Sequence, residues 1–105
     1  MSPFLRHRVT LQLAIRMPDE GGGASLVWSD EALLWARITS QGGDEIARAG
    51  ELVPHARYRV MLRYRDGVSS AMRLLFGSKA LAIDAAYDPD GDRRMLLVDC
   101  HEAAP

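Results

Sequence analysis

Apolar and polar residues alternate with a period of two through much of this chain. Between Leu5 and Arg16 the odd positions are apolar apart from His7, and the even positions are polar apart from Ala14. Successive side chains of a strand point to opposite faces of the sheet, so this pattern predicts a long strand with one buried face. His7 lies near the start of that strand, where we expect it to be partly exposed or hydrogen-bonded.

The rest of the chain gives several further strand patterns separated by turn residues. Strands are expected at residues 26–28 and 32–39, with an interruption at 29–31, and then at 56–65, 72–76, 79–87 and 93–102. A Gly-rich hairpin loop at 17–25 and short turns at 66–67, 77–78 and 88–92 connect them. The pattern predicts a mainly β fold, a small β-barrel or sandwich of five to six antiparallel strands. A length of 105 residues suits one domain, residues 1–105.

Residues 40–55 do not continue the alternation. Asp44 is a suitable helix cap, and Ile46, Ala49 and Val53 recur at helical spacing before Pro54 ends the segment. We therefore expect a long inserted loop that carries one short helix, weakened by its glycines.

Basic residues are concentrated on one face of the strand at 56–65. Four of the thirteen basic residues share this face with Met61, while tyrosine, valine and leucine occupy the other; the four are Arg57, Arg59, Arg63 and Arg65. Because like charges repel, the face needs counter-charges from an acidic protein partner or from solvent, and the sequence leaves both open.

Trp35 falls on the more polar face of its strand. A large aromatic side chain there indicates a surface that is covered. The cover is either another protein or a loop of this chain, and the pattern favours neither.

Composition and charge narrow the class of protein. A net charge of −1 excludes a polycation that binds nucleic acid through its overall charge, and 48% hydrophobic with 26% charged residues is typical of a folded domain. The single cysteine, Cys100, excludes an intrachain disulfide and is expected in the core. Neither a signal peptide nor an apolar run long enough to span a membrane is evident, so we expect a protein made in the cytoplasm.

Catalytic and ligand-binding motifs are weak. Asp88, Asp90, Asp92 and Asp99 approach the spacing of a calcium loop, but the glycine is misplaced and a turn between strands is the better interpretation. The glycines at 21–23 lack the residues that complete a phosphate-binding loop. The three histidines are scattered along the chain. We expect no enzyme, no metal and no cofactor, with a small hydrolase as a distant alternative.

Taken in order, these elements resemble the head–tail joining family of tailed bacteriophages, also called head-closure or stopper proteins. The resemblance rests on RHRVTLQ at 6–12, the glycines at 21–23, two tryptophans, RYRVMLRYRDGV at 57–68, MRLLFG at 72–77, DP at 88–89 and RRMLLVDCHE at 93–102. Related particles such as gene transfer agents carry such proteins too. The resemblance covers nearly the whole chain, and residues 40–55 are the part without a matching motif.

The resemblance implies a β-barrel with an inserted helix or loop, acting as a ring of copies (a hexamer or dodecamer) in the particle neck. The expected neighbours are a portal-side adaptor protein and a tail terminator or tail-tube protein. Double-stranded DNA would be held behind the ring and pass through it without sequence-specific contact, with no membrane and no catalysis involved. The particle, and hence the chain, would be made in the bacterial cytoplasm.

Two sets of residues are candidates for contacts in the ring and for control of the channel. The inter-subunit or inter-ring candidates are Trp35, Arg57, Arg59, Arg63 and Arg65, and the candidates for a channel-gating or docking loop are Gly42, Gly43, Asp44, Glu45, Ile46, Arg48 and Glu51. The alternative function is a small β-barrel nucleic-acid-binding module that places the arginines on phosphates. Against it, Tyr58 and Tyr64 lie on the face opposite the arginines, whereas base stacking needs aromatic and basic groups on one surface.

Overall fold

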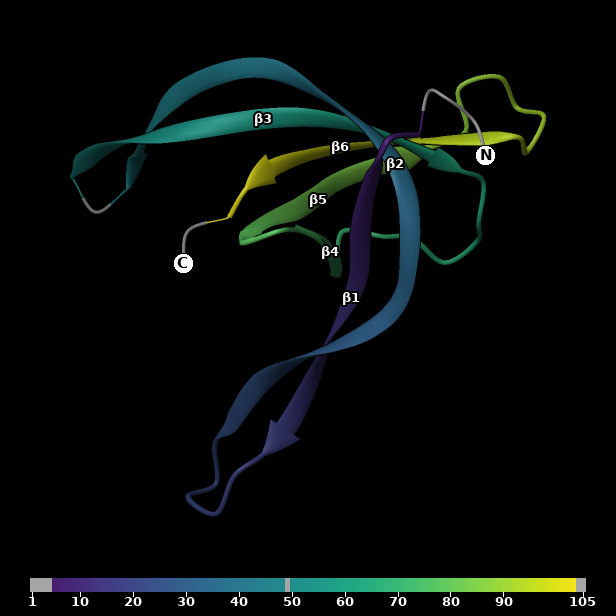
Figure 1. The fold of residues 1–105 in the computed structure, drawn as a ribbon. Coiled ribbons are helices and arrows are strands. Elements are labelled where there is room, and N and C mark those ends of the chain that lie inside the picture. Colours follow the sequence, from purple (N-terminus) through teal and green to yellow (C-terminus); the bar gives the residue numbers. More distant parts are fainter. Residues whose placement is uncertain (1–4, 49, 104–105) are drawn as a thin grey trace.

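The protein is a closed antiparallel β-barrel of six strands. The computed structural model describes residues 5–48 and 50–103, without the side chains of 44–48 and 51–55. The strands are β1 (His7–Pro18), β2 (Ala24–Arg48), β3 (Glu51–Arg63), β4 (Met72–Phe76), β5 (Lys79–Tyr87) and β6 (Met95–Glu102). They close in the order β1-β2-β3-β6-β5-β4 (Figure 1). This confirms the mainly β, barrel-like prediction. Among the described residues no helix is long and apolar enough to cross a membrane.

The predicted short helix at 40–55 is wrong. The segment instead lengthens β2 and β3, which pair from Gly43 with Ala56 out to Arg48 with Glu51. Gly50, with a φ of 82°, lies at the turn between the two strands. A helix this short is marginal in water, and the glycines weaken it further. Extension of the existing ladder pairs the same backbone groups without a new helix nucleus.

The predicted interruption at residues 29–31 is a β-bulge within one continuous strand. Leu11 pairs with Ala32 and Gln12 with Asp30, so Glu31 is the extra residue of β2. A bulge leaves one residue unpaired and bends the strand, which breaks the alternation without ending the strand.

The core lies inside the barrel and takes one face of every strand. Its buried members are Val9, Leu11, Ala36, Val60, Leu62, Met72, Leu74, Leu81, Ile83, Leu96, Val98 and Cys100. In β1, β3 and β6 the buried residues are those that the sequence alternation predicts to face the interior. His7 is half-buried, as expected, with its ring edge-on to Phe76 at 5.1 Å between ring centroids.

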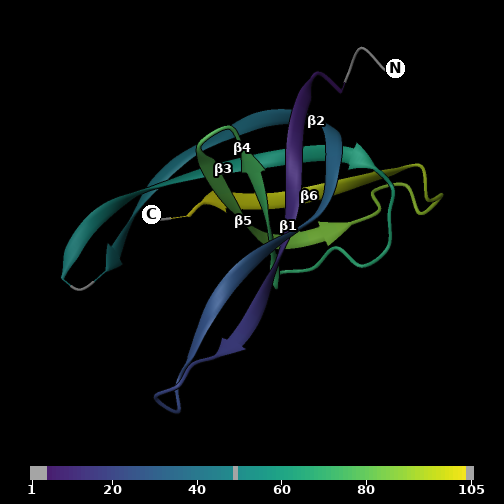
Figure 2. The ribbon, with the colours of Figure 1, turned by 60° about the horizontal axis from the view of Figure 1, so that its bottom comes forward.

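Two hairpins extend beyond the barrel in different directions (Figures 1 and 2). We call residues 14–28 the β1–β2 arm and residues 43–56 the β2–β3 arm. Each begins next to a bulge in β2, at Glu31 for the first and at residues 41–42 for the second. The arms raise the radius of gyration to 15.2 Å, against about 13 Å for a compact domain of this length.

A polar network around the buried Gln12 lies at the base of the β1–β2 arm. The Gln12 side chain is 7% exposed. Its Nε2 donates to Asp30 Oδ1 at 2.7 Å, and its Oε1 accepts from Arg73 Nε at 2.7 Å. The Arg73 guanidinium also lies 4.1 Å from the centre of the Trp28 ring. The network therefore joins β1, β2 and β4 where the arm leaves the barrel.

Aspartates stabilise the tight connections of the barrel. Asp88 accepts hydrogen bonds from the amides of Asp90, Gly91 and Arg93, at 3.3, 2.9 and 2.8 Å. This confirms the turn interpretation of the aspartate cluster. At the tip of the β1–β2 arm, Asp19 Oδ1 accepts from the amides of Gly21 and Gly23 at 3.0 and 2.9 Å. The glycine run is the hairpin loop that the sequence predicts.

Cys100 is a core residue, as expected. It is 1% exposed, and its thiol donates to the carbonyl oxygen of Tyr58 at 3.6 Å. Burial raises the pKa of the Cys100 thiol to about 12, with smaller contributions from the carboxylates of Asp84 and Asp99. A thiol in this environment stays protonated and unreactive at neutral pH.

We predict that Gln12→Ala destabilises the fold by about 1–3 kcal/mol, because it removes two hydrogen bonds of a buried side chain, each of which contributes about 0.5–1.5 kcal/mol. Urea unfolding would measure the loss. Asp30→Asn is the matched control, since an amide oxygen still accepts the Gln12 bond, and its effect should be clearly smaller. Equal stability of Gln12→Ala and the unsubstituted chain would show that the network does not stabilise the fold.

We predict that a thiol reagent at pH 8 labels Cys100 only after unfolding. The folded thiol also keeps its proton to a higher pH than the unfolded one, so its contribution to stability is complete below the unfolded pKa of about 8.5. That contribution is lost as the pH rises towards the folded pKa of about 12. Unfolding curves from pH 8 to 11 should therefore fall more steeply for the unsubstituted chain than for Cys100→Ala. Equal slopes, or rapid labelling of the folded chain, would contradict this.

Candidate interaction surface

The outward faces of β2, β3, β6 and β5 form one continuous surface, which we call the outer wall. The strand register places Arg37, Met61, Leu97 and Tyr87 side by side in one row across it. The next rows hold Arg59 beside Asp99 and Arg63 beside Met95. The outer wall comprises Leu33, Trp35, Arg37, Arg57, Arg59, Met61, Arg63, Tyr87, Met95, Leu97, Asp99 and His101. It therefore mixes arginine with apolar side chains.

Arg59 has a counter-charge within its own chain. Its Nε lies 3.0 Å from Asp99 Oδ1, and the two side chains are 44% and 36% exposed. The hydrogen bond to Asp99 raises the pKa of the Arg59 guanidinium. An exposed pair of this kind contributes little to stability, but it satisfies one arginine of the face without a partner protein.

The other predicted arginines do not all share one environment. Arg57 and Arg63 are exposed on the outer wall, in register with His101 and Met95. Arg65 lies beyond the end of β3 and is half-buried, and its Nε is enclosed without a hydrogen-bond partner. The structure thus gathers three of the four arginines on the outer wall and separates the fourth.

Trp35 lies on the outer wall beneath an arginine of the neighbouring strand. Its side chain is 37% exposed, and Arg8 Cζ lies 4.4 Å from the ring centroid. Arg8 and Trp35 are register partners between β1 and β2. The Arg8 side chain covers part of the ring, and cover by a partner or by a loop of this chain stays a prediction from the sequence. A cation–π contact leaves part of the ring available for a further contact.

The predicted gating or docking residues lie in the β2–β3 arm and its bulge. Gly42, with a φ of 84°, is in the bulge, and its amide donates to Ser40 Oγ at 3.3 Å. Gly43 pairs with Ala56 at the base of the arm. The side chains of the other five predicted residues lie outside the described part of the structure; these are Asp44, Glu45, Ile46, Arg48 and Glu51.

Tyr58 and Tyr64 do not form a stacking platform for nucleic acid bases beside the arginines. Tyr58 is half-buried and packs against the core. The Tyr64 hydroxyl donates to Asp66 Oδ1 at 2.8 Å, and this bond raises the pKa of Tyr64. Within the described residues, no cluster of three or more His, Cys, Asp or Glu side chains is arranged to hold a metal ion.

The sequence analysis missed a set of exposed apolar residues on the β1–β2 arm. Ile15, Met17, Leu26 and Val27 are 40%, 49%, 66% and 50% exposed. The sequence does carry a signal for this surface. In 13–17 and 26–28 both odd and even positions hold apolar residues, whereas a strand with one buried face needs them at only one of the two. Together, the outer wall and the arm provide arginine, methionine, aromatic and aliphatic groups, which are typical of protein–protein contacts.

The comparisons with known proteins agree with this fold. Residues 2–103 match the family described as phage head completion protein. A chain from the virion of a native gene transfer agent particle has the same fold, with a TM-score of 0.80, 22% identity, and coverage of 99% of this chain and 100% of that one. A protein from Shigella flexneri 2a, solved in solution, gives a TM-score of 0.71 and 26% identity, with coverage of 99% of this chain and 98% of that one.

No curated protein matches the chain. The family match spans almost the entire barrel and both arms, so this chain belongs to the phage head completion protein family and is a structural protein of the head–tail neck.

Proposed function

We propose that the chain acts as one connector domain in a homo-oligomeric ring that closes the filled head and joins it to the tail. The main observation that supports this proposal is the match to the phage head completion family over residues 2–103. The shape supports it, because a rigid barrel with two projecting hairpins offers separate surfaces for neighbouring copies and for adjoining rings. The ring is a hexamer or a dodecamer that lies between a portal-side adaptor and a tail terminator or tail-tube protein.

The ring does its work by contact and carries out no reaction. The outer wall supplies arginines for carboxylates of a neighbouring protein, and a guanidinium fork suits such partners. Arg63 is the better candidate on this wall, because Arg59 already binds Asp99. Double-stranded DNA passes through the channel without base-specific contacts.

The β2–β3 arm is the candidate for the part that reaches the channel or an adjacent ring. It extends well beyond the barrel (Figure 1) and is a two-stranded ribbon, which has low stability on its own. Copies of the arm that converge on the ring axis would hold back DNA while the head is full and move aside at ejection. The alternative is a docking arm that grips the neighbouring ring and does not move.

We predict that a particle-producing strain without this chain accumulates DNA-filled heads that lack tails and lose their DNA. Electron microscopy and a nuclease-protection assay would measure both effects, and supplying the chain should restore tailed particles. A reconstruction of the restored particle should place a ring of copies at the neck. Tailed particles made in normal numbers without the chain, or a single off-axis copy, would overturn the proposed function.

We predict that shortening the β2–β3 arm separates gating from joining. Removing the pairs beyond Gly43–Ala56 and closing the strands with a two-residue turn keeps Arg57 and all the pairs between β2 and β3 from Ala36–Leu62 to Gly43–Ala56. If the arm is the gate, tails still join, but nuclease-sensitive DNA rises several-fold. Failure to join tails would assign the arm to docking instead. Matched reconstructions of full and emptied particles check the movement, since an arm in one place in both rules out the gate.

A further inference from the structure

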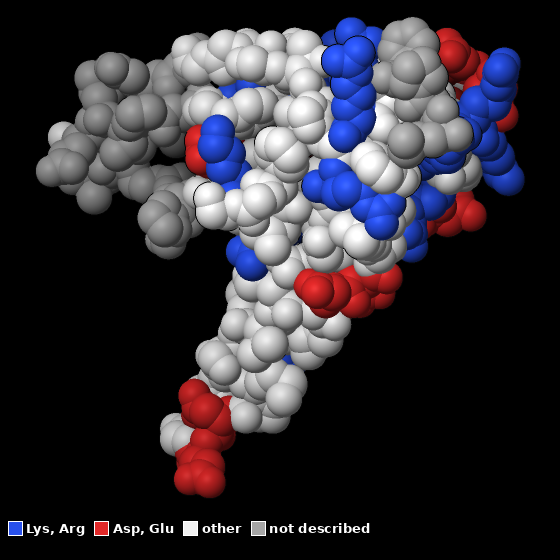
Figure 3. Space-filling view, in the orientation of Figure 1, with Lys and Arg blue, Asp and Glu red and all other residues white. Residues whose placement is uncertain are grey.

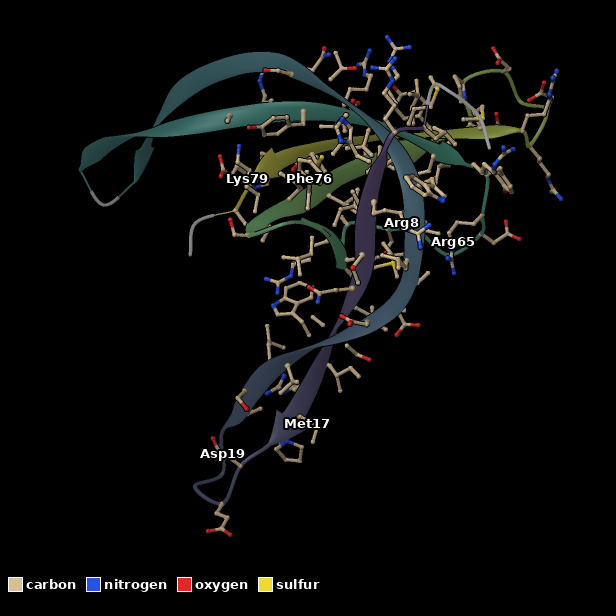
Figure 4. All side chains as sticks on the ribbon, viewed as in Figure 1. Arg8, Met17, Asp19, Arg65, Phe76 and Lys79 are labelled. Atoms are coloured by element: carbon tan, nitrogen blue, oxygen red, sulfur yellow. The ribbon has the colours of Figure 1, made fainter. Side chains whose placement is uncertain are left out.

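The β1–β2 arm is an apolar hairpin with an acidic tip. It consists of the pairs from Ala14–Trp28 to Pro18–Ala24, followed by Asp19 and Glu20 in the loop. Figure 3 shows it as a mostly white projection that ends in red, while blue side chains gather over the barrel. Figure 4 places Met17 and Asp19 near its end, and Arg8 and Arg65 on the barrel. The arm thus presents a narrow apolar surface at a distance from the core.

Both faces of the arm carry exposed apolar residues, with Arg16 beside Leu26 on one of them. Opposite residues of an antiparallel pair share a face, so Ile15 and Val27 lie with Met17 on one side of the ribbon, and Leu26 lies on the other. The four side chains are 40–66% exposed. A two-stranded ribbon with apolar groups open to water on both faces is marginally stable, and its edges remain free to pair. This surface is therefore expected to be covered in the working state.

The arm is held in a defined direction before any partner arrives. Gln12, Asp30 and Arg73 form the polar network at its base. Arg73 also stacks on Trp28, the arm residue of β2 that lies nearest the barrel. At the other end, Asp19 closes the loop by accepting two backbone amides. A hairpin fixed at both ends loses little conformational entropy when it binds, so it is suited to insertion against a partner.

The outer wall has the complementary chemistry. Leu33, Trp35 and Tyr87 are 57%, 37% and 40% exposed there. They lie among arginines at Arg37 and Arg63, with Arg8 stacked on Trp35. An apolar surface with basic groups matches an apolar ribbon with an acidic tip, both in hydrophobic area and in charge. The arm projects away from the barrel, so it does not cover the wall of its own chain (Figures 1 and 2).

We propose that the β1–β2 arm of one copy seats on the outer wall of the next copy, with its acidic tip against the wall arginines. This rests on the proposed ring, and it names the contact that closes it. A head-to-tail contact uses two different surfaces of each chain, and repetition around an axis buries every arm and every wall except at an open end. The acidic partner of Arg63 is then the tip of a second copy of this chain.

The first test removes the apolar surface of the arm without altering the barrel. Leu26→Thr with Val27→Thr keeps strand-forming residues at two exposed positions, so the urea midpoint should not change. We expect the yield of tailed particles to fall tenfold or more. Leu33→Thr on the wall should act in the same direction. Ala71→Thr, at an exposed position just before β4, is the matched control and should leave the yield unchanged.

The second test identifies what covers the arm. A photoreactive benzoylphenylalanine at position 20, irradiated in assembled particles, should join two copies of this chain. Mass spectrometry should map the second site to the outer wall, near Leu33, Trp35 or Arg63. The same residue at position 90, in the β5–β6 turn, is the control and should give no bond to the wall. A bond to a different protein, a bond to another part of a second copy, or none at all overturns the inference.

A charge exchange provides an independent check. Glu20→Arg alone and Arg63→Glu alone should each lower particle yield, because the tip and the wall then repel. Co-expression of the two variants should restore it, since copies can alternate with opposite charges at each contact. No restoration overturns the contact between tip and wall. If the unsubstituted chain is absent from the neck, the proposed function fails; if it is present and these variants behave like it, only this inference fails.

Discussion

Closure of a small barrel around a single apolar interior is the constraint on which the other features depend. Each strand contributes one face to the core, from Val9 and Leu11 in β1 to Val98 in β6, and closure leaves no strand edge open within the barrel. Because the interior is already filled, further apolar residues must lie outside it. Among the described residues, exposed large apolar side chains lie on the outer wall and on the β1–β2 arm, where other molecules can reach them.

The β-bulges connect this rigid body to its projections. An extra residue in a strand bends it and increases its twist, which changes the direction of everything beyond it. In β2 one bulge lies at Glu31 and another at residues 41–42, next to the two arms, and a third at Asp84 in β5 brings that carboxylate 2.9 Å from His101 Nδ1. In this way the bulges give one barrel several surfaces that face in different directions, as a structural protein with several neighbours needs.

The polar groups that matter most are positioned by packing between distant parts of the chain. Gln12 lies on the outward parity of β1, yet it is buried and hydrogen-bonded to Asp30 of β2 and to Arg73 of β4. Arg59 and Asp99 meet because β3 and β6 are neighbours in the closed sheet. These contacts contribute modestly to stability one at a time, and their larger effect is to fix the direction of the arm and the charge pattern of the wall.

Outside residues 40–55 the alternation of residues was enough to assign the strands, the inward and outward faces of β1, β3 and β6, the turns and the buried Cys100, because side-chain direction in a regular strand follows from position alone. It also placed Arg57, Arg59 and Arg63 on one surface. It did not provide the pairing: Gln12 and Arg73 are 61 residues apart, and Arg59 and Asp99 are 40 apart, so no local spacing reveals them. At 40–55 the helical spacing of a few apolar residues was misleading. There the ladder between β2 and β3 outweighed a weak local preference, because the pairing of the two strands within the barrel continues outward along the same hairpin.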